Sequence, residues 1–235
     1  MKAIYGPMHS WRLGECMNVD PICRSPKVCS MDCIYCMHGS SGFVAPRRSD
    51  LVPLSSFKEE LSEVSSHDKS LTMRFSGPGE ATLAENLGLM LEESRQAGVS
   101  RTAVLTNSSL LGRGEVRDEL RKTDIVIAKL DAVDENSFQR INRPHPDIRY
   151  STVVNGLGSL RSGYSGSLRL QVMLVEENRH DVDQLADICQ DIGADLTYLS
   201  TPTRPSSLHS MSRRYMLESA KRFERHGCKV ALRGR

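Results

Sequence analysis

Short apolar runs rich in β-branched residues alternate along this chain with longer stretches of helical periodicity. Six runs have the length and composition of strands, at residues 71–75, 102–106, 124–130, 168–175, 195–200 and 228–232. Between them, apolar residues recur every three or four positions, and the clearest stripes are Phe57, Leu61 and Val64, then Leu83, Leu87, Met90 and Leu91, then Val182, Leu185, Cys189 and Ile192, and finally Met216, Ala220 and Phe223. This alternation predicts an α/β fold with a parallel sheet and right-handed crossovers, either an open doubly wound sheet or a barrel.

The alternation of side chains within the strands favours a barrel. In the run 168–175, aliphatic residues occupy every second position and suit packing under helices, whereas the opposite face is polar or flexible. On this polar or flexible face of the run 168–175 lie Arg169, Gln171 and Met173. Arg74 and Ser76 share one face of the first run, and Lys129 and Asp131 share a face at the end of the third. Polar side chains that point the same way from several parallel strands predict a cavity lined by the sheet, as in a partial barrel that is open at one side. Lys129 and Asp131 lie at a carboxyl strand end, where α/β proteins build their sites.

Length and charge add little to this fold prediction. With 235 residues the chain suits one sizeable α/β domain, and we expect a single domain over residues 1–235. Its 31 basic and 29 acidic side chains leave a formal charge of +2, which neither demands nor excludes a polyanionic partner. The basic residues gather near the end, where residues 212–235 hold eight Lys and Arg against two acids. This basic helix and tail, about 209–235, is either a solvated helix face or a face that contacts phosphate or nucleic acid.

The first residues, MKAIYGPMHS, lack the apolar stretch of a secretory signal, and no segment approaches the 18 apolar residues of a membrane span. We therefore expect a cytoplasmic protein without membrane contact. Seven cysteines, five of them between positions 16 and 36, do not suit a disulfide framework in a reducing compartment. They indicate metal ligands.

Three cysteines stand close together in CSMDCIYC, at Cys29, Cys33 and Cys36. A structural zinc site usually takes a second pair of Cys or His at loop spacing, and no such pair follows this triplet. His38, His67, Cys16 and Cys23 are the remaining candidates to complete a zinc site. An iron–sulfur cluster is the better interpretation, because three thiolates can hold a [4Fe–4S] cluster and leave its fourth iron open to a small molecule.

The spacing CxxxCxxC, with an aromatic residue before the last cysteine and a glycine-rich segment after the next strand, resembles the radical S-adenosylmethionine superfamily. The resemblance extends over residues 4–210 through the segments IYGPMHSWRLGECMNVDPI (4–22), FSGPGEATL (75–83), VLTNSSLL (104–111), EVRDEL (115–120), LDAVDENSFQRINRPH (130–145) and TPTRP (201–205). Their order is similar to that of Fe–S oxidoreductases related to the wyosine synthases, which build a tricyclic guanine beside a tRNA anticodon. The resemblance implies a partial (β/α)6 TIM-like barrel with a [4Fe–4S] cluster and S-adenosylmethionine as cofactors.

The resemblance also implies roles for particular residues. Tyr35 is expected to lie against the adenine of S-adenosylmethionine. The segment 77–80 corresponds to the superfamily's GGEP-type loop, so Gly77, Gly79 and Glu80 are expected to contact the methionine part of the cofactor. Glycines allow close approach of the backbone, and a carboxylate suits an ammonium group. Ala81 replaces the usual proline, which makes this loop less rigid than in the relatives.

Further cofactor contacts are expected at three other strand or helix ends. Asn107 and Ser108 are candidates for the ribose or carboxylate of the cofactor, although TNSS is also ordinary turn chemistry. Lys129 and Asp131 occupy the next strand end, and Lys129 is an alternative contact for substrate. In INRPH, the guanidinium of Arg143 suits a carboxylate, unless the segment is only a rigid turn. We expect His145 to be a surface or turn residue.

The other cysteines are expected to have different roles. Wyosine synthases bind a second cluster through three further cysteines, whereas only Cys16 and Cys23 precede the triplet here. These two are therefore expected to be reduced loop thiols or a redox pair near substrate rather than ligands of a complete second cluster. Cys189 lies on an apolar helical stripe and Cys228 begins a strand, so both are expected to be small core residues.

The implied chemistry is reductive cleavage of S-adenosylmethionine to a 5′-deoxyadenosyl radical, with Arg169, Gln171 and Met173 lining the barrel near the substrate. The substrate remains open between a tRNA base and a small molecule. One alternative is an enzyme that activates or modifies a protein partner, and a non-catalytic zinc or Fe–S scaffold is another. An electron donor such as flavodoxin or ferredoxin is the expected partner, and the oligomeric state is left open.

Overall fold

The computed structural model describes residues 2–40, 42–65, 71–203 and 208–233. Three features singled out in the sequence lie wholly or partly outside these residues: His67, the end of the segment TPTRP, and the last two residues of the basic tail. The described residues contain no helix that combines the length and the apolar character needed to cross a membrane.

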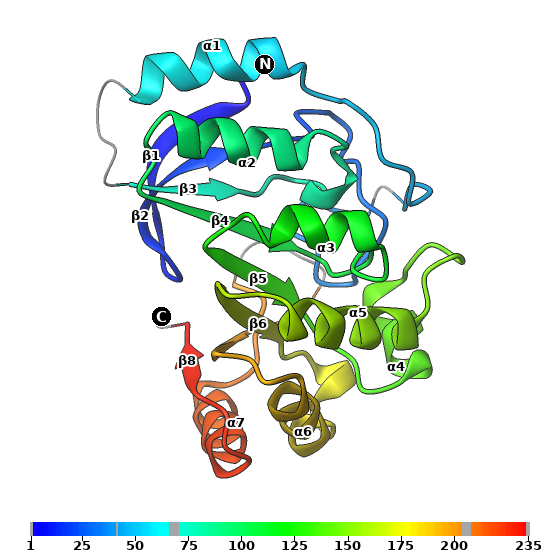
Figure 1. Ribbon diagram of the computed structural model, residues 1–235. Helices are drawn as coiled ribbons and strands as arrows, with labels where there is room; N and C mark the ends of the chain where they lie inside the picture. The colour runs from blue at the N-terminus through cyan, green and yellow to red at the C-terminus, as the bar shows by residue number, and fades with distance from the viewer. Residues whose placement is uncertain (1, 41, 66–70, 204–207, 234–235) are drawn as a thin grey trace.

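A single eight-stranded sheet organises the molecule, with its strands side by side in sequence order (Figure 1). The strands are β1 (Ile4–Ser10), β2 (Gly14–Val19), β3 (Thr72–Phe75), β4 (Arg101–Thr106), β5 (Ile125–Lys129), β6 (Ser167–Met173), β7 (Leu196–Ser200) and β8 (Val230–Leu232). β1 and β2 form an antiparallel hairpin, and every later neighbour pair is parallel. Because β1 and β8 do not pair, the sheet is a curved, open barrel, and the α/β partial-barrel prediction is confirmed.

Helices connect the parallel strands and cover the outer side of the sheet. They are α1 (Leu54–Ser65), α2 (Leu87–Gln96), α3 (Gly114–Leu120), α4 (Glu135–Asn142), α5 (Tyr150–Ser162), α6 (Val182–Ile192) and α7 (Arg213–Arg225). β2 to β7 are each followed by a helix or a helix pair, which gives six β/α units. The apolar stripes predicted from periodicity face the sheet, as Phe57 of α1 does when it packs against Phe75 of β3. Leu83 is an exception, because it belongs to a short 3₁₀ turn, Ala81–Leu83, before α2 begins.

The two faces of β6 separate as predicted. Leu168, Leu170 and Val172 are fully buried in the main core under the helices. On the inner face, Arg169 and Met173 are partly exposed and Gln171 is 6% exposed. The inside of the barrel is therefore lined by polar or flexible side chains, whereas the shell between sheet and helices is aliphatic.

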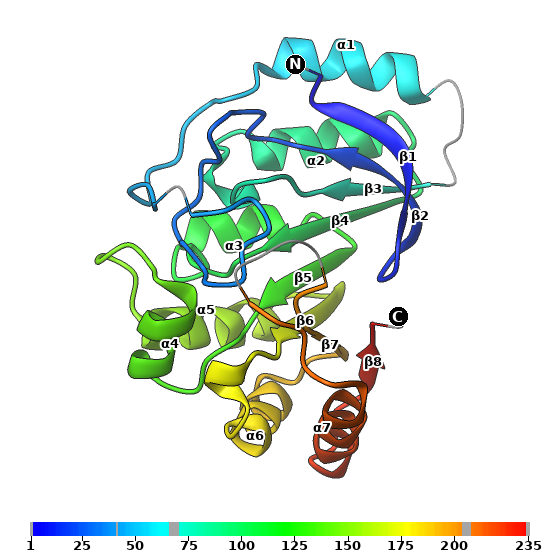
Figure 2. The ribbon, with the colours of Figure 1, turned by 180° about the vertical axis from the view of Figure 1, so that it is seen from behind.

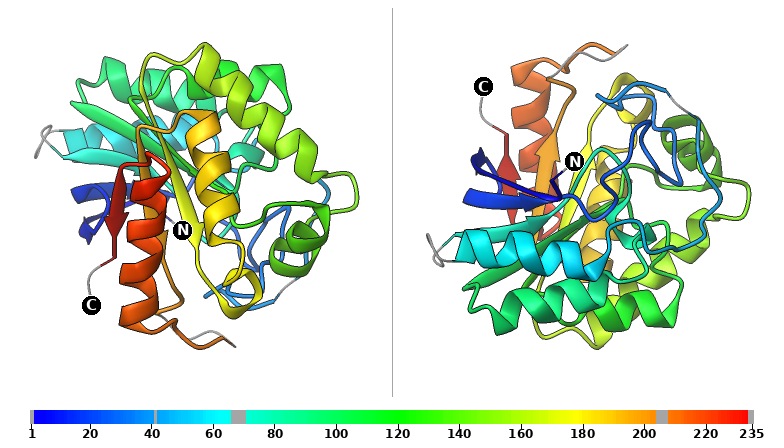
Figure 3. Two further views of the ribbon diagram at one scale, coloured as in Figure 1. Left: turned by 90° about the horizontal axis from the view of Figure 1, so that it is seen from below. Right: turned by 90° about the horizontal axis from the view of Figure 1, so that it is seen from above.

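The β1–β2 hairpin is an element that the periodicity did not predict. In β1 only the two end residues, Ile4 and Ser10, are buried, so buried and exposed positions do not alternate, and Gly6 and Pro7 interrupt the strand. The hairpin tip lies beside β8 in both views of Figure 3. There Trp11 packs edge-on against Tyr198 with ring centroids 5.2 Å apart, and Tyr198 Oη donates a hydrogen bond to Arg12 O at 2.9 Å. Together with Leu13, Ile125 and Ile127, these residues form a small apolar cluster inside the barrel at the amino ends of the strands.

Candidate functional site

The cysteine triplet lies on the long loop between β2 and α1, at the ends toward which the parallel strands point (Figure 2). This is the edge of an α/β sheet where ligands usually bind, because loops from several strands meet there. Cys29, Cys33 and Cys36 are each partly exposed. The triplet therefore lies at the same edge of the sheet as the strand ends that carry Asn107, Lys129 and Asp131.

The loop is held by backbone hydrogen bonds to a segment far away in sequence. Residues 141–145, which include the last two residues of α4 and the segment after it, run antiparallel to residues 30–34. The bonds are Ile34 N to Ile141 O at 3.0 Å, Asp32 N to Arg143 O at 3.0 Å and His145 N to Ser30 O at 2.9 Å. This pairing fixes the backbone between the first and the second cysteine, so the INRPH motif acts first of all as a clamp on the cysteine loop.

Each of the three sulfurs accepts a hydrogen bond from a different nitrogen donor. Asn107 Nδ2 lies 3.5 Å from Cys29 Sγ, Asn142 Nδ2 lies 3.5 Å from Cys33 Sγ, and Lys27 Nζ lies 3.3 Å from Cys36 Sγ. Donors around a sulfur stabilise its thiolate form, which is the form that ligates metal. The donor set therefore fits an iron–sulfur cluster held by three thiolates.

Without such a cluster, burial disfavours the thiolates. Burial, followed by the nearby Glu80 carboxylate, raises the pKa of Cys29 to about 12. Burial likewise raises the pKa of Cys33, against the opposing effects of Lys129 and of hydrogen bonds from Tyr35 and Asn142. Because a metal binds only the deprotonated sulfur, loading this loop must release protons. Among the described residues, no group of three or more His, Cys, Asp or Glu side chains is arranged around a single metal ion.

Lys27 is a functional candidate that the sequence analysis missed. Its side chain is 3% exposed, and burial alone would lower its pKa, but hydrogen bonds to Cys36 and Asp32 raise the pKa overall. The ammonium group also donates to Gly39 O at 2.9 Å. The only signal in the sequence is a lysine two positions before the first cysteine, which by itself is typical of an exposed residue.

The two glycines of segment 77–80 allow close approach of protein backbone. A Cβ atom on Gly79 would lie 2.1 Å from Val28 O, and one on Gly77 would lie 2.3 Å from Asp20 Oδ1. Glu80 N donates to the same Val28 carbonyl at 3.0 Å. The glycines therefore bring this loop against the start of the cysteine loop, while their predicted contact with S-adenosylmethionine stays a prediction.

The Glu80 carboxylate is buried, with 2% exposure, and faces the protein. Its Oε1 accepts from Thr82 N, Thr82 Oγ1 and Thr106 Oγ1 at 3.1, 2.6 and 2.6 Å, and its Oε2 accepts from Asn107 N at 2.6 Å. Burial raises the pKa of Glu80, although these hydrogen bonds oppose the shift. Glu80 thus ties the ends of β3 and β4 together and orients Asn107 toward Cys29.

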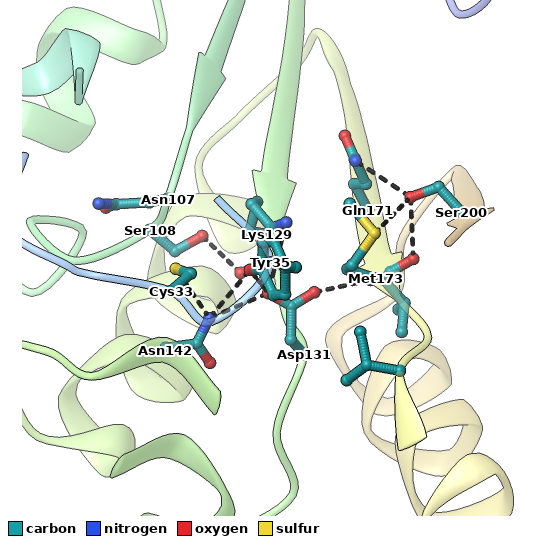
Figure 4. Close-up of polar contacts among 12 residues, drawn as sticks. Cys33, Tyr35, Asn107, Ser108, Lys129, Asp131, Asn142, Gln171, Met173 and Ser200 are labelled. Atoms are coloured by element: carbon teal, nitrogen blue, oxygen red, sulfur yellow. Dashed lines mark hydrogen bonds and ion pairs between the residues drawn. The ribbon is translucent and has the colours of Figure 1, made fainter. Parts of the chain in front are cut away.

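Tyr35, Lys129, Asp131 and Asn142 converge in one buried polar cluster (Figure 4). Tyr35 Oη donates to Asp131 Oδ2, and Asn142 Nδ2 donates to Asp131 Oδ2 at 3.0 Å and to Tyr35 Oη at 3.2 Å. Lys129 Nζ lies 4.2 Å from the centre of the Tyr35 ring and 3.4 Å from Asp131 Oδ2. Burial, followed by the Asp131 charge, raises the pKa of Tyr35 well above its usual range, so the phenol remains a donor.

Asp131 is the centre of this cluster and links it to β6. Its Oδ1 accepts from Met173 N at 2.7 Å, and its side chain has no exposed surface. Gln171 and Ser200, which hydrogen-bond each other at 3.3 Å, line the neighbouring inner face (Figure 4). The sequence analysis predicted both Asp131 and Lys129 as cofactor contacts, and this stays a prediction. In the structure Asp131 is the common acceptor of the polar cluster, and Lys129 is its partly exposed cation.

Asn107 and Ser108 face different directions. Asn107 Nδ2 lies 3.3 Å from Ser30 Oγ, in addition to its contact with Cys29. Ser108 is fully buried and has a positive φ of 71°, and its hydroxyl donates to Lys129 O at 2.8 Å. Of the two, only Asn107 borders the cysteines. Ser108 joins the ends of β4 and β5.

The structure does not bring the Arg143 side chain to this cluster. Arg143 ends α4 in the left-handed conformation, with φ 45° and ψ 61°, and its exposed side chain lines a surface groove with Phe43, Pro146 and Arg149. The preceding residue, Asn142, points to Cys33 instead. The assignment of Arg143 to the cofactor carboxylate gains no support from this placement and stays a prediction. Asn142 stands in the same motif, and the sequence analysis did not identify it as a site residue.

Two arginines lie on the inner face of the barrel. Arg74 Nε donates to Asn18 Oδ1 at 2.5 Å, and Arg169 Nη1 donates to Tyr198 Oη at 2.8 Å. Within the described part of the chain, neither guanidinium has a carboxylate partner within ion-pair distance. The inner face therefore carries two guanidinium groups that form no close ion pair with the described acids.

The remaining cysteines lie outside the triplet. Cys16 is fully buried on β2, where its thiol donates to Met8 O at 3.4 Å, and Cys23 is partly exposed beside Lys2 O. Burial raises the pKa of both thiols. Cys189 and Cys228 belong to the main hydrophobic core, so their assignment as small core residues is confirmed.

Comparison with known proteins agrees with this geometry. The Radical SAM superfamily profile matches residues 25–189, which include the triplet and the ends of β3 to β6. A UPF0026 protein from Synechocystis sp. is 33% identical over 212 residues, which cover 88% of this chain and 77% of that protein. A UPF0026 protein from Methanocaldococcus jannaschii is also 33% identical, and the match spans 65% of its length. These matches do not show the predicted relation to the wyosine synthases.

Among solved structures, Streptococcus suis SuiB bound to S-adenosylmethionine has a similar fold, with a TM-score of 0.69 at 13% sequence identity. The match covers 92% of this chain but 50% of SuiB, so this chain corresponds to about half of that protein. With the cysteine loop at the carboxyl strand ends and the profile match over most of its length, this chain belongs to the radical SAM superfamily of enzymes.

Proposed function

We propose that this protein holds a [4Fe–4S] cluster through Cys29, Cys33 and Cys36 and uses it to cleave S-adenosylmethionine reductively. The observation that carries this proposal is the set of three separate nitrogen donors, Lys27, Asn107 and Asn142, one on each sulfur. When bound, the cluster would supply one electron to S-adenosylmethionine, giving methionine and a 5′-deoxyadenosyl radical that takes a hydrogen atom from substrate. A reducing cytoplasm with a flavodoxin or ferredoxin as donor suits such chemistry.

The protein's own residues position and shield these groups. Backbone carbonyls at Gly77 and Gly79, the Asn107 amide and the Lys129 ammonium border the cysteine loop and are the proposed contacts for S-adenosylmethionine. The Lys129 side chain is 21% exposed and is the accessible charge of the set, whereas Asp131 is fully enclosed. Asp131 holds Tyr35 and Asn142 in place, so the cluster loop keeps its shape while the open side of the barrel admits substrate.

We further propose an anionic substrate, with an RNA base preferred, as the resemblance to wyosine synthases implies. The guanidinium groups of Arg74 and Arg169 inside the barrel, which form no close ion pair with the described acids, favour a phosphate-bearing molecule. On α7, Arg213, Lys221 and Arg225 are exposed, whereas Arg222 pairs with Asp183 and Arg214 with Glu218. The basic C-terminal helix is thus partly a solvated face whose cations pair with acids of α6 and α7, and the cations that no described acid pairs are available to an RNA backbone.

Modification of a protein partner is the second candidate. The sheet is open between β1 and β8, which leaves one side accessible to a macromolecule. Two proteins of similar fold hold peptides in solved structures: SuiB with its precursor peptide, and anSMEcpe with a peptide and AdoMet. Both share less than a sixth of their residues with this chain, at 13% and 15% identity, so they support the accessibility of such a fold rather than this substrate.

Anaerobic reconstitution tests the core of the proposal. We expect about four iron atoms per chain and release of 5′-deoxyadenosine when S-adenosylmethionine and dithionite are added. Cys33→Ala should abolish both, whereas Cys228→Ala, a buried cysteine outside the loop, should retain both. Wild-type protein that binds zinc instead, or that binds iron but releases no 5′-deoxyadenosine, would contradict the proposal. Either result would favour the non-catalytic zinc or Fe–S scaffold.

Substrate class requires a separate experiment. We expect modified-nucleoside profiles of tRNA to differ between a wild-type strain and a deletion strain, and the difference to be restored by the wild-type gene but not by Cys33→Ala. An unchanged profile, together with a peptide or protein that gains a modification only in the wild-type strain, would replace the RNA substrate with a protein partner.

A further inference from the structure

Lys27 is a buried cation at the cysteine loop whose charge the proposed reaction does not yet use. Its side chain is 3% exposed, and its ammonium group lies 3.3 Å from Cys36 Sγ, 3.2 Å from Asp32 Oδ1 and 2.9 Å from Gly39 O. These three acceptors use all three ammonium hydrogens. The geometry is therefore specific, and the cation has a fixed place beside one sulfur.

The three sulfurs of the loop have unequal environments. Asn107 and Asn142 are neutral donors, each 3.5 Å from its sulfur, whereas the donor to Cys36 is charged and closer. A charge-assisted hydrogen bond is stronger than one between neutral groups. Among the donors that the described residues offer to these sulfurs, Lys27 is the one that brings a full positive charge.

Asp32 is the second charged group of this arrangement. It lies between the first and the second cysteine, its side chain is 10% exposed, and it also accepts a hydrogen bond from Ser40 Oγ. Lys27 and Asp32 therefore place opposite charges on the same loop, within a few ångströms of the cluster ligands. Because both side chains are largely withdrawn from water, their charges act on a neighbouring redox group with less screening than charges at the surface.

We propose that Lys27 is a positioning residue that raises the reduction potential of the iron–sulfur cluster through its charge-assisted hydrogen bond to Cys36. Accepting an electron makes the cluster and its thiolates more negative, and a fixed ammonium group beside a ligand sulfur stabilises that reduced state. Net charge and hydrogen bonds to sulfur are among the factors that set such potentials. This inference rests on the proposed function only in that the triplet must hold the cluster.

A purely structural role for Lys27 has different consequences. Since the same ammonium group ties Asp32 and Gly39 together, its loss could simply loosen the loop and reduce the amount of cluster bound. Loosening would lower occupancy for any substitution at either partner. An electrostatic role instead predicts opposite shifts in potential when the positive and the negative partner are removed separately.

The test measures the midpoint potential of the cluster in reconstituted protein without S-adenosylmethionine. A redox titration is monitored by electron paramagnetic resonance. We expect Lys27→Met to move the midpoint to more negative values and Asp32→Asn to move it to more positive values. Lys27→Arg should stay closer to wild type than Lys27→Met does. Lys58→Met serves as the matched control, because Lys58 is exposed on α1 and pairs with Glu93, and its midpoint should equal that of wild type.

The outcomes separate this inference from the proposed function. If wild-type protein takes up no cluster, the proposed function fails. If it does take one up and the midpoint of Lys27→Met equals that of Lys58→Met, the role of Lys27 is overturned while the proposed function stands. If Lys27→Met holds no cluster, Asp32→Asn decides: a midpoint that is unchanged or more negative overturns the inference, and a more positive one supports it.

Discussion

Two aspartates flank β5, one at each end of the barrel, and their surroundings differ sharply. Asp124, just before the strand, is exposed and accepts hydrogen bonds from Thr102 N at 2.7 Å and from Thr102 Oγ1 at 3.0 Å. Asp131, just after it, is 2% exposed and accepts from Tyr35, Asn142 and the Met173 amide. An aspartate therefore accepts hydrogen bonds at an exposed position at one end of the barrel, whereas at the other end an aspartate holds a buried polar cluster together.

The contrast extends to the whole of each end. At the amino ends of the strands, Trp11 and Leu13 of the hairpin tip pack with Tyr198 of β7 and other apolar side chains inside the barrel. At the carboxyl ends, buried polar groups are hydrogen-bonded to one another and to the cysteine loop. Burying polar groups stabilises a fold only when all of them are paired, so the carboxyl end is more vulnerable to substitution. The amino end contributes stability, whereas the carboxyl end contributes geometry for chemistry.

The largest expected effect is that of Asp131→Asn. The amide would turn at least one N–H toward buried donors, leaving Tyr35 Oη or the Met173 amide without an acceptor, at a cost of about 3 kcal/mol in the free energy of unfolding. Cleavage of S-adenosylmethionine should also be lost. Asp124→Asn is the matched control and should cost only about 1 kcal/mol without loss of cleavage. Urea unfolding measures the free energy of unfolding of the two variants, and release of 5′-deoxyadenosine measures cleavage. Equal losses in Asp131→Asn and Asp124→Asn would contradict the difference between the two ends.

A second test uses two glycines. Gly79→Ala places a methyl group 2.1 Å from Val28 O at the start of the cysteine loop, so one of the two loops must move. We expect the free energy of unfolding to fall by about 2 kcal/mol and the protein to bind less iron. Gly158 is exposed in α5 and has no atom within 4 Å of an added Cβ, so Gly158→Ala should instead raise stability by about 0.5–1 kcal/mol. Full iron content in Gly79→Ala would show that the cysteine loop does not depend on this contact.

At the amino end, Tyr198→Phe removes one hydroxyl and leaves the ring. That hydroxyl donates to Arg12 O and accepts from Arg169, so its loss should lower the free energy of unfolding by about 1 kcal/mol. Iron content after reconstitution should equal that of wild type, because these contacts lie at the opposite end from the cysteines. A variant that unfolds like wild type but binds less iron would reverse the roles assigned to the two ends.

Periodicity predicted the sheet and its shell because repeated burial of one strand face leaves a clear pattern. It located the six runs that became β3 to β8 and the face of β6 that carries Arg169, Gln171 and Met173. It missed the β1–β2 hairpin because β1 is mostly exposed and is interrupted by Gly6 and Pro7. An edge strand with little burial has no alternation for the sequence to display.

The candidate site was predictable in its residue types but not in their orientations. The cysteine spacing, Lys129 and Asp131 stood out in the sequence, whereas Lys27 and Asn142 did not, since their roles depend on which way each side chain turns. At the end of α4 the left-handed Arg143 directs its own side chain to the surface, while Asn142 faces Cys33. The Asn142 orientation depends on a contact between residues 109 positions apart, and that of Lys27 depends on how the cysteine loop folds back on itself. Local pattern encodes neither of them.

The smallest expected effect concerns the N-cap of α4, the helix that ends at Asn142. Asp134 accepts hydrogen bonds from Ser137 Oγ and Ser137 N, and these bonds lower the pKa of Asp134. A lowered pKa in the folded state means that the stabilisation is present above the unfolded pKa, about 3.9, and disappears as pH falls through the folded value. Because Asp134 is exposed and screened, the loss in Asp134→Ala at pH 7 should be about 1 kcal/mol or less.

Asn caps a helix nearly as well as Asp, so Asp134→Asn should keep most of the stability at pH 7 and flatten the acid limb of the stability profile. Ser212, which caps α7 by accepting from Tyr215 N at 3.2 Å, gives the matched comparison. Ser212→Ala should lose a similar amount of stability but retain its iron against a chelator. Asp134→Ala should release iron faster, because α4 carries the backbone and the Asn142 amide that hold the cysteine loop. Equal iron release from the two cap variants would mean that the loop keeps its shape independently of α4.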